Sequence, residues 1–86
     1  MTKEIPNGWH IEENSLVREF EFKDFLAALD FVNAVGTRAE AVQHHPDILL
    51  HSYRKVKITT TTHDTGRLTE KDFELAERIN RLQPPQ

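Results

Sequence analysis

The stretch "KDFLAALDFVNAVGTRAEAVQ", residues 23–43, decides the fold, because it places one amphipathic helix between two regions with strand-like patterns. Apolar residues recur along it at helical spacing and form a stripe that we expect to pack on a sheet: Phe25, Ala28, Leu29, Val32, Val35 and Ala39. A second flank, which can face a partner helix, consists of Ala27, Phe31 and Ala34. Pro46 disfavours helical geometry at His45, so the helix is expected to end by about residue 44.

Short strands are expected on both sides of this helix. Before it, residues 9–13 and 16–22 are joined by a short polar turn, and this arrangement predicts a β-hairpin. After it, residues 48–51 and 53–62 predict a second pair of strands. The last strand ends in four threonines, which are β-branched and typical of strands. Its residues Val56, Ile58 and Thr60 share one face.

The segment "LTEKDFELAERINRL", residues 68–82, predicts a second helix with a clear start. Thr69 is a favourable N-cap, and Asp72 stands three residues later at capping-box spacing. The resulting order, ββαββα, predicts an α+β fold in which two helices pack on one face of a four-stranded antiparallel sheet.

Length and composition indicate one small domain, residues 1–86, for which association with a second copy is a reasonable expectation. The chain has no cysteine, which fits a reducing cytoplasm. Its apolar runs are far shorter than the ~20 residues that span a membrane. With 14 acidic and 11 basic residues it is a poor candidate for nucleic-acid binding.

Histidines supply the unusual chemistry. His44 and His45 stand together at the end of the first helix, where one imidazolium can stabilise the last carbonyls but two need a further reason. His63 follows the threonines and has the strand parity opposite to the apolar face, so it is not expected in the core. His10 and His51 are expected to be surface or structural residues.

Metal binding is the first explanation to weigh for these imidazoles. Three of them with Asp47 or Glu40 nearby would match the ligand types of a catalytic zinc. The chain contains neither an HxH nor an HExxH spacing, so we favour acid–base work without a metal or cofactor. Because imidazole titrates near neutrality, one ring can protonate a leaving hydroxyl while another removes a proton from the neighbouring atom.

Taken together, the polar residues form a constellation with defined spacing: Glu40, the run His44-His45-Pro46, Tyr53, His63 and Asp72. This constellation resembles the signature of the pterin-4a-carbinolamine dehydratases, and the resemblance extends over nearly the whole chain. It implies dehydration of 4a-hydroxytetrahydrobiopterin to quinonoid dihydropterin without metal or cofactor, which recycles the pterin of aromatic amino acid hydroxylases. It also implies homodimers, often paired into homotetramers through helix 24–43.

The resemblance implies roles for the three histidines. His44 and His63 would be general acids for the 4a-hydroxyl, and His45 would bind the pterin and act as base. Around them, Asp72 would support His63, and Glu40 would help to arrange the pocket.

Further family features surround these side chains. Pro46 would end the helix beneath the histidine pair, and the backbone around Thr61 and Thr62 would meet the polar edge of the pterin. The sequence departs from the family at Ile48, where an aromatic residue, usually Trp, is frequent.

A binding module is the alternative to an enzyme. Members of this family are known to act as partner proteins, including transcriptional coactivators, and the small-residue flank of the first helix could serve such a role. A third alternative is a chain that aids assembly of another enzyme through a surface that does not bind pterin. A chain that only binds partners has no physical need for three imidazoles in register, and this feature favours the enzyme.

Overall fold

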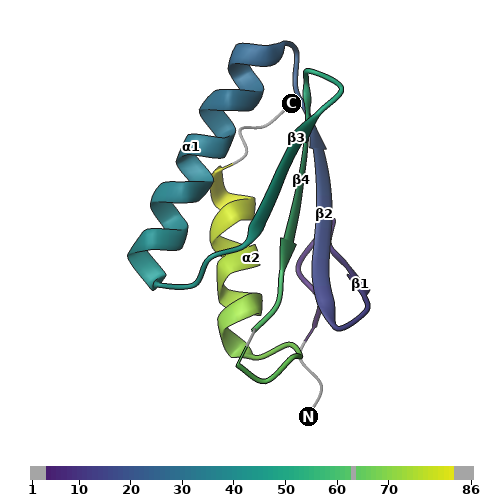
Figure 1. Cartoon of the computed structure of the whole chain (residues 1–86), viewed down its shortest axis with the longest axis vertical. Coiled ribbons are helices and arrows are strands. Elements are labelled where there is room, and N and C mark those ends of the chain that lie inside the picture. Colours follow the sequence, from purple (N-terminus) through teal and green to yellow (C-terminus); the bar gives the residue numbers. More distant parts are fainter. Residues whose placement is uncertain (1–3, 63, 83–86) are drawn as a thin grey trace.

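The computed structural model describes residues 4–62 and 64–82. Its elements are β1 (His10–Glu12), β2 (Ser15–Glu21), α1 (Phe25–Val42), β3 (Asp47–His51), β4 (Lys55–Thr60) and α2 (Glu70–Leu82). The strands form one antiparallel sheet in the order β1-β2-β4-β3. Both helices lie on the same side of this sheet (Figure 1). The predicted α+β fold with ββαββα order is therefore confirmed.

Two tight turns set the ends of the strands. Glu13 and Asn14 both have positive φ and close the predicted hairpin of β1 and β2, in which His10 pairs with Val17. Ser52 and Tyr53 also have positive φ, at 51° and 53°. Because these left-handed residues make the turn between β3 and β4, the last strand begins at Lys55 and not at residue 53 as predicted.

Helix α1 is bounded by caps that the sequence encodes. The Asp24 side chain accepts a hydrogen bond of 2.8 Å from the backbone N–H of Ala27 at the start. At the end, Gln43 adopts the left-handed conformation with a φ of 55°, and the backbone N–H of His44 donates to Ala39. This cap turns the chain away from the helix axis just before Pro46, so the histidine pair lies in the connection to β3.

The buried side of α1 differs from the predicted stripe. Four of its residues are buried: Ala28, Phe31, Val35 and Ala39. Phe25 and Leu29, predicted to pack on the sheet, are 47% and 36% exposed. Phe31 was assigned to the other flank, but its ring centroid lies 4.6 Å from that of Phe20 in the core. This aromatic contact rotates α1 so that the i, i+3, i+7, i+11 stripe faces the sheet, and the prediction was wrong at these positions.

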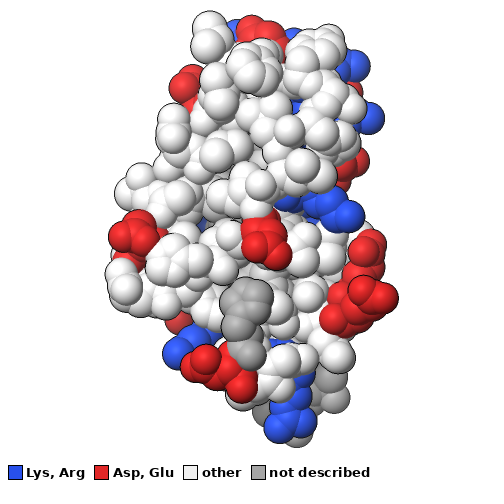
Figure 2. All heavy atoms as spheres, viewed as in Figure 1, with Lys and Arg blue, Asp and Glu red and all other residues white. Residues whose placement is uncertain are grey.

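Helix α2 begins as predicted. The Thr69 hydroxyl accepts from the backbone N–H of Lys71, and the Asp72 carboxylate accepts from the backbone N–H of Thr69. Among the described residues, no helix is both long and apolar enough to cross a membrane. Figure 2 shows that the upper part of this face, over α1, is mostly uncharged, whereas acidic and basic side chains are scattered over the rest of the face, including near its centre.

Candidate active site

Three segments meet at the lower end of the molecule in Figure 1: the C-terminal end of α1, the chain that follows β4, and the N-terminal end of α2. They enclose a pocket of about 220 Å³, which is lined by Gln43, His44, His45, Thr62, Asp64 and Lys71. The C-terminal cap of α1 brings both imidazoles to this pocket. Helix α2 carries Asp72, whose carboxylate contacts His44. His63 lies outside the described residues.

Asp72 is the buried centre of the site, with no exposed surface. Its Oδ1 accepts from the hydroxyl of Thr60 at 2.7 Å and contacts Nε2 of His44 at 2.6 Å. Its Oδ2 accepts from the hydroxyl of Thr62 at 2.7 Å and from the backbone N–H of Thr69 at 3.0 Å. A carboxylate offers about four lone-pair positions, so the acceptor capacity of Asp72 is fully used.

The hydroxyls around Asp72 form a directed chain. Thr62 has one hydroxyl proton and donates it to Asp72, so in the 2.7 Å contact between the hydroxyls of Thr62 and Thr69 the donor is Thr69. The hydroxyl of Thr69 accepts in turn from the backbone N–H of Lys71. Such a chain polarises each successive bond toward the carboxylate. Asp72 also lies in the first turn of α2, where the helix dipole favours a negative charge.

This environment keeps Asp72 ionised. Burial pushes the pKa of the carboxyl group up, but the hydrogen bonds from Thr60, His44, Thr69 and Thr62 outweigh burial and leave the pKa of Asp72 below its ordinary value. An ionised carboxylate can only accept, so Nε2 of His44 must carry the proton in their contact. Within the described part of the chain, no hydrogen bond uses Nδ1 of His44. Nδ1 is therefore the ring nitrogen that remains for a ligand.

His45 makes the same kind of contact in a different setting. Its Nε2 is hydrogen-bonded to Oε2 of Glu40, one turn earlier in α1. The side chains of His45 and Glu40 are 57% and 70% exposed, so water competes for both. The backbone carbonyl of Glu40 accepts from the side-chain amide of Gln43 at 2.7 Å. The pocket thus has one imidazole that is largely buried, His44, and one that is exposed, His45, and each contacts a carboxylate through Nε2.

The structure brings together most of the predicted site residues. His44, His45 and Thr62 line the pocket, and Asp72 and Glu40 hold the two imidazoles. The predicted support of His63 by Asp72 falls outside the described residues, and the imidazole that Asp72 holds within them is that of His44.

Two predicted residues lie at the margin of the pocket. The hydroxyl of Thr61 donates to the backbone carbonyl of Asn14 at 2.8 Å, so it is directed toward the β1–β2 turn. Pro46 is half-buried and begins the connection to β3. Neither is among the residues that line the pocket.

Four residues of the site were not predicted: Gln43, Thr60, Asp64 and Lys71. A signal existed for Thr60, because a hydroxyl on the same strand face as Val56 and Ile58 must find a buried partner. Asp64 and Lys71 are exposed charged residues, and their place at the pocket depends on how the chain after β4 meets α2. In residues 4–62 and 64–82, no group of three His, Asp or Glu side chains could hold a metal ion.

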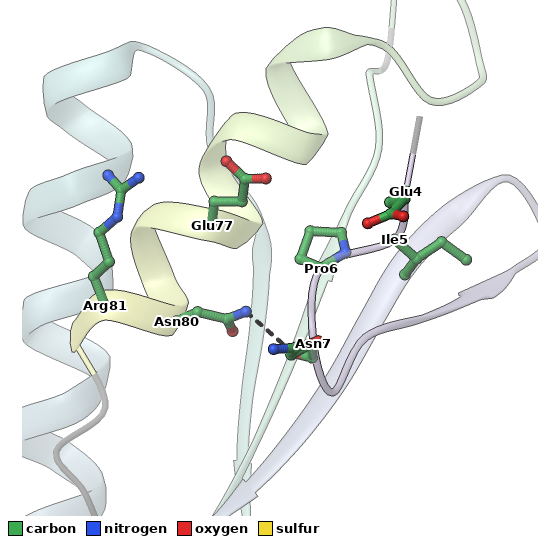
Figure 3. Close-up of a pocket in the computed structure, with 7 residues that line it drawn as sticks. All are labelled: Glu4, Ile5, Pro6, Asn7, Glu77, Asn80 and Arg81. Carbon is green, nitrogen blue, oxygen red and sulfur yellow. Dashed lines mark hydrogen bonds between the residues drawn. The ribbon is translucent and has the colours of Figure 1, made fainter. Parts of the chain in front are cut away.

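A second hollow, of about 360 Å³, lies between the N-terminal segment and the later turns of α2 (Figure 3). Here the side-chain amide of Asn80 donates to the backbone carbonyl of Asn7 at 3.1 Å, as Figure 3 shows. The side-chain oxygen Oδ1 of Asn80 accepts from the indole N–H of Trp9 at 2.8 Å and from the guanidinium of Arg18 at 2.7 Å. These bonds attach the N-terminal segment to α2, so the polar groups at this hollow hold the fold together.

An α+β fold with two carboxylate-paired imidazoles at one pocket is suited to acid–base chemistry. Comparison with known proteins gives the family. The family model described as Pterin 4 alpha carbinolamine dehydratase matches residues 1–82. A protein of Nostoc punctiforme that bears the name pterin-4-alpha-carbinolamine dehydratase is 49% identical over 91% of this chain and 83% of its own length. A protein of the same name from a Cyanothece species is 53% identical over 86% of this chain and 75% of its own length. The chain therefore belongs to the pterin-4a-carbinolamine dehydratases, which are hydro-lyases.

Solved structures agree with this assignment. The crystal structure of a transcriptional coactivator/pterin dehydratase from Brucella melitensis superposes with a TM-score of 0.81 at 32% identity, and covers 87% of this chain and 81% of that chain. A pterin dehydratase-like protein identified as a RuBisCO assembly factor in the alpha-carboxysome has a TM-score of 0.71, with coverage of 91% and 89%. Its identity is 20%, so this second likeness concerns the fold alone.

Proposed function

We propose that this chain dehydrates 4a-hydroxytetrahydrobiopterin to quinonoid dihydropterin by histidine acid–base catalysis without metal or cofactor. The observation that carries the proposal is the pair His44 and His45 at one pocket, each with Nε2 hydrogen-bonded to a carboxylate. The carbon–oxygen bond at C4a breaks, an imidazolium gives its proton to the departing hydroxyl, and a neutral imidazole takes a proton from the neighbouring ring atom. One water molecule is released and no electrons are exchanged.

Each residue of the site has its own role in the dehydration. His44, anchored by Asp72, acts as a general acid together with His63, and His45 binds the pterin and acts as base. Glu40 orients His45. The backbone around Thr61 and Thr62 meets the polar edge of the pterin.

The reaction takes place in the cytoplasm and recycles the pterin that an aromatic amino acid hydroxylase uses. The protein works as a homodimer or homotetramer assembled through α1. Support for this assembly comes from the apolar side chains that α1 leaves in solvent, since Phe25 is 47% exposed and Leu26 is 70% exposed.

A binding module is the second candidate. The Brucella melitensis relative is described as both a coactivator and a dehydratase, and the exposed apolar side of α1 offers a surface for a partner. A binding module would form a complex with its partner equally well when His44, His45 and His63 are replaced.

The decisive assay follows the ultraviolet absorbance of a 4a-hydroxytetrahydropterin generated in situ by a pterin-dependent hydroxylase. We expect accelerated decay with the native protein, retention of the acceleration after treatment with a chelator, and a loss of ~10²–10⁴-fold in His63→Ala. Decay no faster than in buffer would overturn the enzyme and favour the binding module. Loss of activity with the chelator would overturn the metal-free mechanism.

A further inference from the structure

Thr60 places a polar group in the apolar core. It lies on the helix-facing side of β4 beside Val56 and Ile58, and all three are fully buried. A buried hydroxyl without a partner destabilises the fold. Thr60 avoids this cost because its hydroxyl donates to Oδ1 of Asp72 at 2.7 Å. A valine of nearly the same shape would fill this position equally well, so the hydroxyl needs a further reason.

That reason lies in the atom to which Thr60 donates. Oδ1 of Asp72 is also the oxygen that holds Nε2 of His44, at 2.6 Å. Thr62 and the backbone of Thr69 occupy the other oxygen. With donors on both oxygens, the carboxylate group is fixed against rotation about its last bond. Thr60 is the donor that holds the oxygen facing the imidazole.

We propose that Thr60 is a positioning residue of the candidate active site, which anchors Oδ1 of Asp72 so that His44 keeps its proton on Nε2 and offers Nδ1 to the ligand. A role of Thr60 in catalysis rests on the proposed dehydratase function, whereas its effect on the tautomer of His44 can be tested without that function. The pair of Glu40 and His45 lacks such an anchor for its carboxylate within the described residues. Among the hydrogen bonds of the described residues, the Glu40 carboxylate accepts from His45 and from no further donor.

The test uses Thr60→Val, which removes the hydroxyl and keeps the shape, and Thr60→Ser, which keeps the hydroxyl. Thr59→Val is the matched control, because Thr59 lies on the opposite face of the same strand and pairs with Val17 and Asp47. The tautomer is measured by long-range ¹H–¹⁵N correlation spectra of the imidazoles at about pH 9, above the ordinary imidazole pKa of ~6.5. His44→Gln assigns the signals of His44.

We expect the native protein, Thr60→Ser and Thr59→Val to show His44 as the Nε2–H tautomer, and Thr60→Val to show a mixture of both tautomers. In the dehydratase assay, Thr60→Val should lose about tenfold in kcat while Thr60→Ser retains activity. A pure Nε2–H signal in Thr60→Val would overturn the positioning role. An Nδ1–H signal in the native protein would overturn it without any variant. An inactive native protein with the expected tautomers would instead overturn the proposed function and leave the role of Thr60 supported.

Discussion

Two neighbouring histidines contact carboxylates through the same ring nitrogen, but their surroundings are opposite. The side chains of His44 and Asp72 are 11% and 0% exposed, whereas those of His45 and Glu40 are 57% and 70% exposed. Asp72 accepts from three further donors, and Glu40 lies in solvent on the surface of α1. Adjacent positions in the chain are therefore not equivalent positions in the site.

The difference has a physical consequence. An exposed ion pair typically contributes about 0.2–1 kcal/mol, because water and salt compete with the partner. Removal of one partner from a buried pair costs about 3–5 kcal/mol, because polar groups are left buried and unpaired. The pair of Asp72 and His44 should therefore control both the stability of the fold and the orientation of the His44 imidazole, whereas the pair of Glu40 and His45 should only adjust the orientation of the His45 imidazole.

The largest expected effect comes from truncation of the buried carboxylate. Asp72→Ala leaves the hydroxyls of Thr60 and Thr62 and Nε2 of His44 without their acceptor, and should lower the free energy of unfolding by about 3–5 kcal/mol. Glu40→Ala should change it by about 1 kcal/mol or less. Urea unfolding at one protein concentration measures both. Equal losses in the two variants would remove the distinction between the pairs.

Acid should lower the stability of the fold through the buried carboxylate of Asp72. The folded state lowers the pKa of Asp72 from its ordinary value of 3.8. The carboxylate therefore stabilises the fold fully above about pH 4, and this stabilisation is lost as the pH falls through the lower pKa of the folded state. Asp72→Asn cannot titrate and should lack this part of the acid dependence. Unfolding free energies measured between about pH 5 and pH 2 test this, and parallel curves for the two proteins would contradict it.

Salt should produce the smallest effect and act on the exposed pair. At about pH 5, below the ordinary imidazole pKa of ~6.5, Glu40→Gln should cost about 0.2–1 kcal/mol of stability at low ionic strength and nothing measurable at 1 M salt, where the Debye length is about 3 Å. The cost of Asp72→Asn should persist at both salt concentrations, because the buried pair is screened much less. Urea titrations at the two salt concentrations compare the variants. A salt-independent cost of Glu40→Gln would show that this pair is shielded from solvent.

Local signals in the sequence predicted most of the fold. Alternating strands, the helix stop at Pro46 and the capping box of Thr69 and Asp72 depend on neighbours in the chain, and all were confirmed. The errors concerned the start of β4 and the positions Phe25, Leu29 and Phe31 on α1. The choice between two apolar stripes on α1 depends on the aromatic core that the sheet supplies.

The site was predictable in its residue types but not in its pairing. His44 and Asp72 are 28 positions apart, and only the packing of α1 beside α2 brings them into contact. The capping role of Asp72 was visible from spacing, while its contact with His44 was not. Thr60 was overlooked because a run of threonines is typical of strands, although its place on the apolar face indicated a buried partner.

The dehydration rates of Asp72→Asn and Glu40→Gln compare the two carboxylates in a single assay. Both substitutions remove one negative charge from a carboxylate that contacts an imidazole in the same pocket. We expect a loss of ~10²–10⁴-fold in kcat for Asp72→Asn, because His44 loses its fixed tautomer, and a change within about fivefold for Glu40→Gln. An equal loss in both variants, or full activity in Asp72→Asn, would contradict a site organised around the buried pair.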